Sequence, residues 1–215
     1  MNAHPAKMIL EADETMSLNL AVLLDTMANA IIANAAELTE LDSAIGDADH
    51  GLNMKRGFEA VRSERSNILA KPLPDAISAV GYALVMNIGG ASGPLYGTLF
   101  MTLGRELNAN PSLADLGRSL VAAGAAVSAR GKAEIGSKTI LDVLLPVAAH
   151  VASGTATFES VRHLASASAV ETITMKALRG RASFLGERSI GHMDPGAKSC
   201  EILIAAACDA LEGMQ

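Results

Sequence analysis

The chain has 215 residues, of which 50% are hydrophobic but only 3% are aromatic, and its formal net charge at pH 7 is −6. This length suits a single domain with a substantial core, and the acidic balance argues against a nucleic-acid binder, whose affinity depends on basic side chains that neutralise phosphates. It does not exclude a small anionic ligand, which needs only a local positive site.

The N-terminal segment has no apolar stretch followed by a cleavage site, so we expect no signal peptide. No uninterrupted apolar run further along approaches the roughly 20 residues of a membrane span. We therefore expect a cytoplasmic protein without a membrane partner. Apolar residues instead recur at three- and four-residue steps, a pattern typical of amphipathic helices; the first such run is Leu20, Leu23, Leu24, Met27, Ile31 and Ala35.

This periodicity predicts eight helices and no credible pair of strands. Short connections rich in glycine, proline and polar residues separate them, and short connections favour antiparallel neighbours. Alternate connections then lie at the same end of the fold, where we expect a site. The sequence predicts an all-α, up-and-down bundle or barrel, with helices over about residues 19–41, 52–67, 75–87, 98–107, 112–129, 139–151, 158–178 and 196–212.

The connection after the first predicted helix carries three aspartates, Asp42, Asp47 and Asp49. Like charges this close repel each other unless a cation lies among them, and Gly46 and Gly51 permit breaks that fold the carboxylates inward. Oxygen ligands suit hard cations such as Mg²⁺, Mn²⁺ or Ca²⁺. Two divalent ions would leave one positive charge to attract a polyphosphate. The alternative is a solvated acidic turn in which Asp42 caps a helix.

His50 and Asn53 follow the aspartates, and each either meets a phosphate or ribose or serves the end of the next helix. The glycine-rich stretch 87–97 opens the fourth predicted helix. Such a turn presents free N–H groups and a positive dipole end to an anion. It matches neither a P-loop nor a dinucleotide fingerprint, and close helix packing is the alternative. Beside the aspartates, phosphate binding is the favoured interpretation.

The loop over residues 131–139 nearly spells a P-loop, but Ser137 adds a residue between Gly136 and Lys138. A P-loop also needs a preceding strand, whereas an alanine-rich helix precedes this loop. We therefore reject that interpretation. Lys138 or Thr139 either faces a nucleotide or belongs to a plain loop and helix cap.

The segment over residues 179–196 gathers Arg179, Arg181 and Arg188 in an otherwise acidic chain. Arginine can clamp phosphate oxygens through paired hydrogen bonds, and glycines at both ends suit a lid; the alternative is a solvated basic surface. Phosphoryl transfer needs mainly metals and positioned positive charge rather than a protein nucleophile. The pattern therefore indicates a nucleotide-holding module whose acceptor is bound elsewhere.

The closing helix carries the two cysteines, Cys200 and Cys208. At this spacing on a helix their Cα atoms lie about 12 Å apart, which is too far for a disulfide. We expect two buried thiols, consistent with a reducing cytoplasm.

Four motifs stand in order along the chain: Leu-Asp at 41–42 with Gly-Asp-Ala-Asp-His-Gly-x-Asn-Met at 46–54, Gly-Gly-Ala-Ser-Gly-Pro-Leu-Tyr-Gly at 89–97, Gly-Arg-Ala-Ser at 180–183, and Asp-Pro-Gly-Ala at 194–197. Together they resemble the L subunit of dihydroxyacetone kinase (DhaL). The resemblance runs from about residue 18 to 212. It implies a single domain over residues 1–215, folded as a barrel of eight antiparallel amphipathic helices with a nucleotide at one end.

The resemblance also implies roles for the matched residues. Asp42, Asp47 and Asp49 would hold two Mg²⁺ ions that bridge the phosphates of ADP or ATP, and Arg181 would stabilise the transferred phosphate. In the family the ketose is bound covalently to a histidine of a separate K subunit, so this chain would carry half of the site. The implied nucleotide contacts are His50, Gly51, Leu52, Asn53, Ala91, Ser92, Gly131, Ile140, Arg181, Asp194, Pro195 and Gly196.

Three positions depart from the family pattern. Ala48, Ser137 and Phe184 stand where glycine, aspartate and tyrosine are usual. None of them is an implied metal ligand, so the resemblance still implies activity. Ala48 is expected to stiffen its loop slightly.

We therefore expect a kinase subunit that transfers a phosphoryl group from a Mg-bound nucleotide to dihydroxyacetone or a related short ketose such as erythrulose. Either ATP exchanges, or ADP stays bound and is recharged by a phosphotransferase-system protein. The alternatives are a catalytically inactive nucleotide-sensing module that contacts a transcription regulator, and a structural helical bundle with an incidental acidic loop. The sequence leaves the oligomeric state open, a homodimer included.

Overall fold

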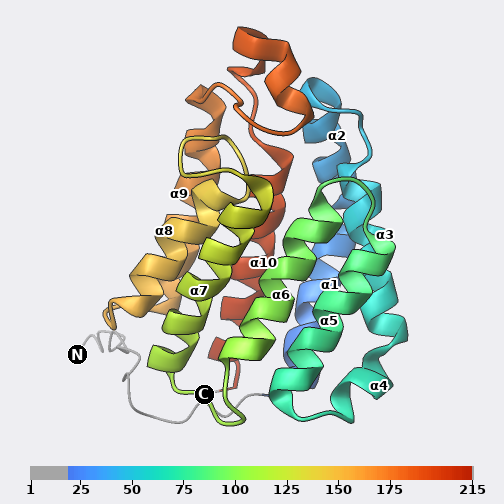
Figure 1. The fold of residues 1–215 in the computed structure, drawn as a ribbon, viewed down its shortest axis with the longest axis vertical. Coiled ribbons are helices and arrows are strands. Elements are labelled where there is room, and N and C mark those ends of the chain that lie inside the picture. The colour runs from blue at the N-terminus through green and yellow to red at the C-terminus, as the bar shows by residue number, and fades with distance from the viewer. Residues whose placement is uncertain (1–18, 215) are drawn as a thin grey trace, which may run out of the picture.

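The computed structural model describes residues 19–214, which form eight long helical rods around one hydrophobic core (Figure 1). The first rod consists of α1 (Leu20–Ala33) and α2 (Ala35–Ile45), which meet at an angle of 52°. The second is α3 (His50–Ser63), followed by the short α4 (Arg65–Leu69). The other rods are α5 (Leu73–Asn87), α6 (Ser92–Glu106), α7 (Leu113–Gly131), α8 (Leu141–Ala152), α9 (Phe158–Glu171) and α10 (Pro195–Glu212).

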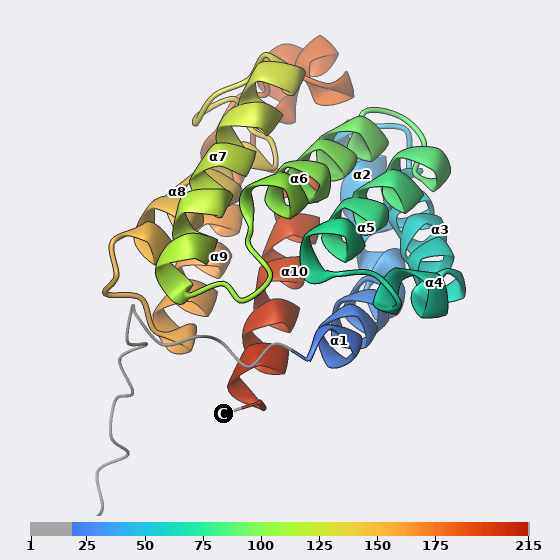
Figure 2. The same ribbon diagram turned by 60° about the horizontal axis from the view of Figure 1, so that its bottom comes forward.

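The rods form a closed ring. Each lies against the next one along the chain, and α10 packs against α1 and so closes the barrel. Seen towards the lower end, α7, α8 and α9 lie on one side and α1, α3 and α5 on the other, with α6 and α10 between the two groups (Figure 2). The predicted all-α, up-and-down fold is confirmed, and it is the barrel rather than the open bundle.

Each rod turns an apolar stripe towards the inside of the ring. On α1 this stripe is Leu24, Met27, Ala28 and Ile31, which recur at three- and four-residue steps and are all buried. Apolar side chains also surround a cavity of about 210 Å³ in the middle of the barrel. A second cavity opens at the upper end of the barrel and is described below. The fully buried Tyr96 lines both cavities and so lies between them.

Several helix ends differ from the predicted ones. The predicted helix over 19–41 is interrupted at Asn34, whose side-chain amide donates to the carbonyl of Ala30 at 2.8 Å and competes with the helical ladder. The fourth rod begins earlier than predicted, at Ser92, because Pro94 fits the first turn of a helix, where its missing N–H is not needed.

The predicted helix over 158–178 ends at Glu171 and continues only as a 3₁₀ turn, η1 (Thr172–Thr174). The segment predicted to be irregular contains a longer 3₁₀ stretch, η2 (Arg181–Ser189). By contrast, the prediction that Ser112 or Asp115 starts a helix is confirmed, because the two form a reciprocal capping box on α7.

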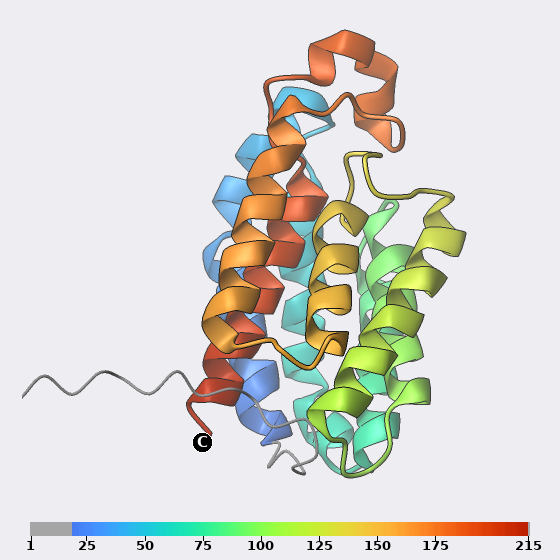
Figure 3. The same cartoon turned by 90° about the vertical axis from the view of Figure 1, so that its left-hand side faces the viewer.

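The alternation of helix direction places one set of connections at the upper end of the barrel in Figure 1. These are the α2–α3 loop, the α5–α6 loop, the α7–α8 loop and the segment between α9 and α10. Figure 3 shows η2 standing over this end. The prediction that alternate connections share one end of the fold is therefore confirmed.

The two cysteines are free and buried on α10, as predicted. Within residues 19–214 no single helix is long and apolar enough to cross a membrane. The α1–α2 pair, which is bent by 52°, has the necessary length and composition only when its two helices are counted together. The predicted absence of a signal peptide concerns residues 1–18, which lie outside the described residues.

The close packing of α6 against α5 depends on a glycine, Gly104. A Cβ at Gly104 of α6 would overlap the Ser78 hydroxyl and the Pro74 carbonyl oxygen of α5. We expect Gly104→Ala to lower the free energy of unfolding by about 1–3 kcal/mol, since the two backbones must separate. Urea unfolding measures this change.

Gly124→Ala in α7 is the matched control. There a Cβ meets only the flexible end of Leu145, at 2.7 Å, so the better helix propensity of alanine should leave stability unchanged or raise it by about 0.5–1 kcal/mol. Equal losses in the two variants would contradict this account of the α5–α6 contact.

Candidate functional site

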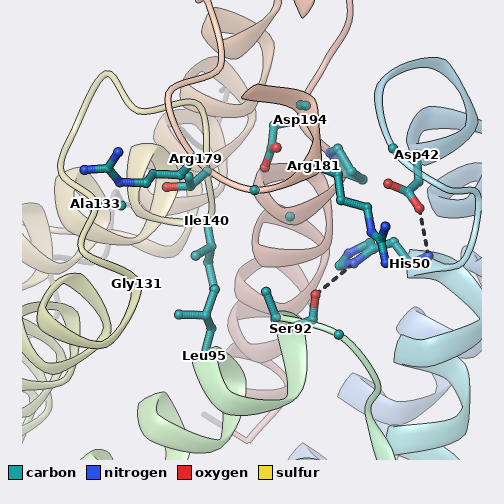
Figure 4. A pocket seen from close by; sticks show the side chains of 18 of the residues that line it. Asp42, His50, Ser92, Leu95, Gly131, Ala133, Ile140, Arg179, Arg181 and Asp194 are labelled. Atoms are coloured by element: carbon teal, nitrogen blue, oxygen red, sulfur yellow. Dashed lines mark hydrogen bonds between the residues drawn. The ribbon is translucent and has the colours of Figure 1, made fainter. Parts of the chain in front are cut away.

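A cavity of about 470 Å³ opens at the upper end of the barrel (Figure 4), within the range of small-molecule sites. The α2–α3 loop, the start of α6, the α7–α8 loop, the residues around Gly180 and the start of α10 form its walls. Most of the residues singled out from the sequence line it: Asp42, Asp47, Asp49, His50, Asn53, Ala91, Ser92, Gly131, Ile140, Arg181, Asp194, Pro195 and Gly196.

Two residues of the expected set lie outside the cavity wall. Gly51 is buried against α2, where a Cβ would overlap the carbonyl oxygen of Ala35, so its role in this structure is close packing. The neighbouring Leu52 is 62% exposed on the outside of α3.

The three aspartates converge. One carboxylate oxygen from each of Asp42, Asp47 and Asp49 lies within 4.8 Å of the others. Asp42 belongs to the last turn of α2, while the other two lie in the loop that follows. Ala48 between them has a φ of 60°, a left-handed conformation that costs a residue with a Cβ about 1 kcal/mol. The loop therefore carries strain at Ala48.

Asp42 serves two structural elements at once. Its Oδ2 accepts hydrogen bonds from the backbone N–H groups of Asp49 at 2.9 Å and His50 at 3.1 Å, which caps α3. Its other oxygen approaches Gly46 so closely that a Cβ there would overlap it. The cap and the aspartate cluster, considered as alternatives from the sequence, are both present, since Asp42 belongs to each.

The donor set fits a hard divalent cation. All three ligands are carboxylate oxygens, and Asp42 is buried, so the cluster is costly without a positive charge nearby. Such a charge is close: the Arg181 guanidinium lies 2.9 Å from Oδ2 of Asp47. Arg181 reaches over the cavity from η2 with a side chain that is 69% exposed.

Four helices, α3, α6, α8 and α10, begin at this end and turn the positive ends of their dipoles towards it. Carboxylates occupy three of these starts. Asp42 caps α3, Asp194 accepts from the N–H of Ala197 at 2.7 Å on α10, and Asp142 accepts from the N–H groups of Thr139 at 2.6 Å and Gly136 at 2.5 Å ahead of α8. The start of α6 has neither a side-chain cap nor an acidic residue in its first turn, whereas α8, which also lacks a cap, carries Asp142 in its first turn. The start of α6 is therefore the helix end best suited to an anion.

His50 links three rods. Its Nδ1 lies 3.1 Å from the Ser92 hydroxyl on α6 and its Nε2 lies 3.0 Å from the Ser199 hydroxyl on α10. Ser199 also bonds the Tyr96 hydroxyl at 2.7 Å. Burial lowers the pKa of His50, which favours the neutral imidazole. In this structure His50 thus positions Ser92 at the start of α6, in addition to opening α3.

Asn53 lies one turn into α3 and is held by a residue that the sequence analysis did not single out. Arg56 donates to Oδ1 of Asn53 at 2.8 Å and to the carbonyl of Asn87 at 2.6 Å. Because Oδ1 is occupied, the side-chain amide N–H₂ of Asn53 remains as the donor available to the cavity.

The opposite wall is apolar. Leu95 and Ile140 face the cavity beside Gly131 and Ala133 (Figure 4), and Val127 continues this wall. Leu95 and Val127 were not among the residues predicted to line a site. Helical spacing could have identified them, since each lies one turn from a predicted residue, Ser92 and Gly131 respectively. A flat apolar group fits this side, and an anion fits the other.

The basic residues divide among different tasks. Arg181 lies over the aspartates, while Arg179 lines the cavity and donates from Nε to the carbonyl of Lys132 at 2.5 Å. Arg188 is exposed and outside the cavity wall. Lys138 and Thr139 both line the cavity, but the Lys138 ammonium donates to backbone carbonyl groups.

Burial raises the pKa of Asp194 from its ordinary 3.8 to about 7, although the N–H of Ala197 and the Lys138 ammonium act in the opposite direction. The folded protein therefore binds this proton more tightly than the unfolded chain does. The resulting stabilisation is fully present below about pH 4 and is lost as the pH rises to about 7.

Residues 44–209 match the DAK2 domain family. The chain is 43% identical over 171 residues to the ADP-binding subunit DhaL of the PEP-dependent dihydroxyacetone kinase of Escherichia coli, covering 75% of this chain and 81% of the relative. It is 36% identical over 170 residues to the ADP-binding subunit DhaL of the PTS-dependent dihydroxyacetone kinase of Lactococcus lactis, covering 79% of this chain and 85% of the relative.

A solved structure shares the fold. The dihydroxyacetone kinase of C. freundii, crystallised in complex with AMP-PNP and Mg²⁺, superimposes with a TM-score of 0.70 at 21% identity. The alignment covers 97% of this chain and 37% of that longer one.

The Asp194 carboxyl gives a pH-dependent prediction. Asp194→Asn keeps an acceptor for the start of α10 but removes the titration. Between about pH 4 and pH 7 the free energy of unfolding of the wild type should fall, relative to the variant, by up to about 4 kcal/mol, since each pKa unit is worth about 1.4 kcal/mol. Urea unfolding across this range measures the difference, and parallel curves for the two proteins would contradict the assignment.

Proposed function

The chain belongs to the DAK2 domain family, among its DhaL-type subunits, and from this we propose that it is the nucleotide-binding subunit of a dihydroxyacetone-type kinase. Its task would be to present the phosphoryl group of a Mg-bound nucleotide to a short ketose. We further propose that residues 1–215 act as one nucleotide-binding domain.

One observation carries the proposal: three elements suited to a nucleotide polyphosphate lie in one cavity. They are the carboxylate cluster, the uncapped start of α6 and the Arg181 guanidinium. The apolar wall of Leu95 and Ile140 lies across the same cavity and suits the base. Neither a structural acidic loop nor a plain metal site requires all of these together.

In this proposal each element has one task. Asp42, Asp47 and Asp49 hold Mg²⁺, and two ions would outweigh the three negative charges and attract the phosphates. When bound, the metal supplies positive charge that offsets the charge on the phosphate oxygens. The N–H groups at Ala91 and Ser92 bind phosphate oxygens at the positive end of α6.

The remaining contacts orient the nucleoside. Asn53 donates from its side-chain amide, and Gly131 and Ile140 contact the base or ribose along the apolar wall. Asp194, Pro195 and Gly196 close the pocket at the start of α10. His50 contributes by placing the Ser92 hydroxyl.

Arg181 is the proposed catalytic residue. Without a cation it pairs with Asp47. A metal at Asp47 would compete for that carboxylate and repel the guanidinium, which would then be free to bind phosphate oxygens of the nucleotide. The same side chain would thus offset the acidic cluster in the free protein and the phosphate charge in the loaded one.

The acceptor is proposed to lie on a ketose-binding K subunit. The names of the relatives support this assignment, since DhaL is called the ADP-binding subunit of a kinase. The terms PEP-dependent and PTS-dependent support a phosphotransferase-system protein as the donor that recharges bound ADP.

The first test concerns the metal. Asp47→Ala should abolish Mg²⁺-dependent binding of ADP, because it removes one of three ligands and the partner of Arg181, while helical content stays intact. Calorimetry with and without Mg²⁺ measures the affinity. Asp75→Ala, which removes an exposed carboxylate from the first turn of α5, is the charge-matched control. Unchanged ADP affinity in Asp47→Ala would sink the metal assignment.

The second test concerns the arginine. Arg181→Ala should slow phosphoryl transfer to dihydroxyacetone, assayed with a K subunit and a phosphoryl donor, by about a hundredfold, with a smaller loss of ADP affinity. Arg188→Ala removes an equally exposed arginine of η2 outside the cavity and should keep wild-type turnover. Normal turnover in Arg181→Ala would remove this residue from the mechanism.

A further inference from the structure

Lys138 is a buried cation in an unusual setting. The residue is 1% exposed, and within residues 19–214 no carboxylate forms an ion pair with its ammonium. Leaving a charged group in this position without hydrogen bonds would be costly. Three backbone carbonyl groups meet the need: Nζ donates to the oxygens of Met175 at 3.1 Å, Ser189 at 2.7 Å and His192 at 2.5 Å.

These three carbonyl groups bracket η2. Met175 precedes η2, Ser189 is its last residue and His192 follows it. A single side chain from the α7–α8 loop therefore joins both ends of the segment that carries Arg181. Hydrogen bonds to a charged donor are stronger than neutral ones, so this junction is a strong one.

Further hydrogen bonds close the same junction. The Ser189 hydroxyl accepts from the N–H of Ala177 at 2.9 Å, and the N–H of Gly191 donates to the carbonyl of Ile173 at 2.8 Å. The N–H of Leu178 donates to the carbonyl of Ser137, next to Lys138, at 3.1 Å. Residues 175–192 thus form a loop with adjacent ends, which we call the lid.

Beyond this base the lid is held by one small apolar cluster, in which Ala182 and Leu185 pack against Ile45 of α2. Its Phe184 is 89% exposed, and the Arg181 side chain that reaches Asp47 is largely in solvent. Surface ion pairs of this kind contribute little energy. The position of Arg181 over the cavity therefore depends on the base of the lid more than on its tip.

We propose that Lys138 is a positioning residue that pins both ends of the lid and thereby holds Arg181 over the acidic end of the cavity. This inference rests on the proposed function for its consequence, since Arg181 acts there on a nucleotide. The pinning itself is a property of the fold and can be tested without any ligand.

Lys138→Met removes the ammonium and keeps the length of the side chain. We expect trypsin to cut the lid about tenfold faster, because loss of the hydrogen bonds at its two ends raises the population of open lids. The lid contains four trypsin sites, Lys176, Arg179, Arg181 and Arg188. A fluorescent ADP analogue in Mg²⁺ should dissociate about tenfold faster for the same reason. Helical content should remain that of the wild type.

Lys132→Met is the matched control. Lys132 precedes the same loop and also has a positive φ, 49° against 59° at Lys138. It is exposed, and Arg179 of the lid binds its backbone carbonyl, which the substitution keeps. It should leave both rates unchanged. Since it removes the same charge from the same loop, a rate increase in both variants would contradict a specific role of the Lys138 ammonium.

A double variant separates positioning from general support of the fold. In the Arg181→Ala background, Lys138→Met should add less than about a twofold further increase in ADP dissociation, because its effect passes through Arg181. A full tenfold increase in that background, or wild-type rates in Lys138→Met, would overturn the proposal. Failure of the proposed function itself is seen separately, as absent Mg-dependent ADP binding by the wild type.

Lys138→Gln covers the case in which the methionine variant does not fold. Glutamine keeps two N–H donors for the same carbonyl groups, and the same measurements then apply to it. If neither variant folds, the ammonium supports the whole barrel rather than the lid, and the proposal is wrong.

Discussion

The closure of eight antiparallel rods into one ring is the constraint on which the rest of this structure depends. Because direction alternates around the ring, α3, α6, α8 and α10 all begin at the same end. Their dipoles make that end electropositive before any basic side chain is counted. An acidic protein can in this way offer an anion site without a basic surface.

Carboxylates lie at the starts of three of these helices, and none lies at the start of the fourth, α6. Asp42, Asp142 and Asp194 satisfy the N–H groups at or just before α3, α8 and α10, while α6 begins without a side-chain cap. The carboxylates therefore offset the positive charge at three helix starts, but not at the glycine-rich turn that opens α6. The division accounts for a polar pocket with a cation cluster on one side and an anion site beside it.

The lid adds a third charge that is held differently from the others. The cluster and the helix ends belong to the rigid ring, whereas Arg181 stands on a loop fastened mainly at its base. A guanidinium placed in this way can exchange a carboxylate partner for phosphate oxygens without moving the barrel. The buried Lys138 fixes the ends of the lid, so that its exposed tip keeps a defined position.

The sequence by itself determined the all-α, up-and-down fold and the charged residues at one end of it, because helical periodicity and the aspartate, glycine and arginine motifs are local patterns. Periodicity left a bundle and a barrel as alternatives, and the packing of α10 against α1 decided for the barrel. The sequence did not show that Leu95 and Val127 line the pocket, that the Asp42 cap and the aspartate cluster coexist, or that Lys138 binds carbonyl groups of the lid. Only the tertiary structure decided these. Helical spacing places Leu95 on the same face as Ser92, but it does not say which other helix or loop that face meets, because such contacts depend on how separate elements pack in space.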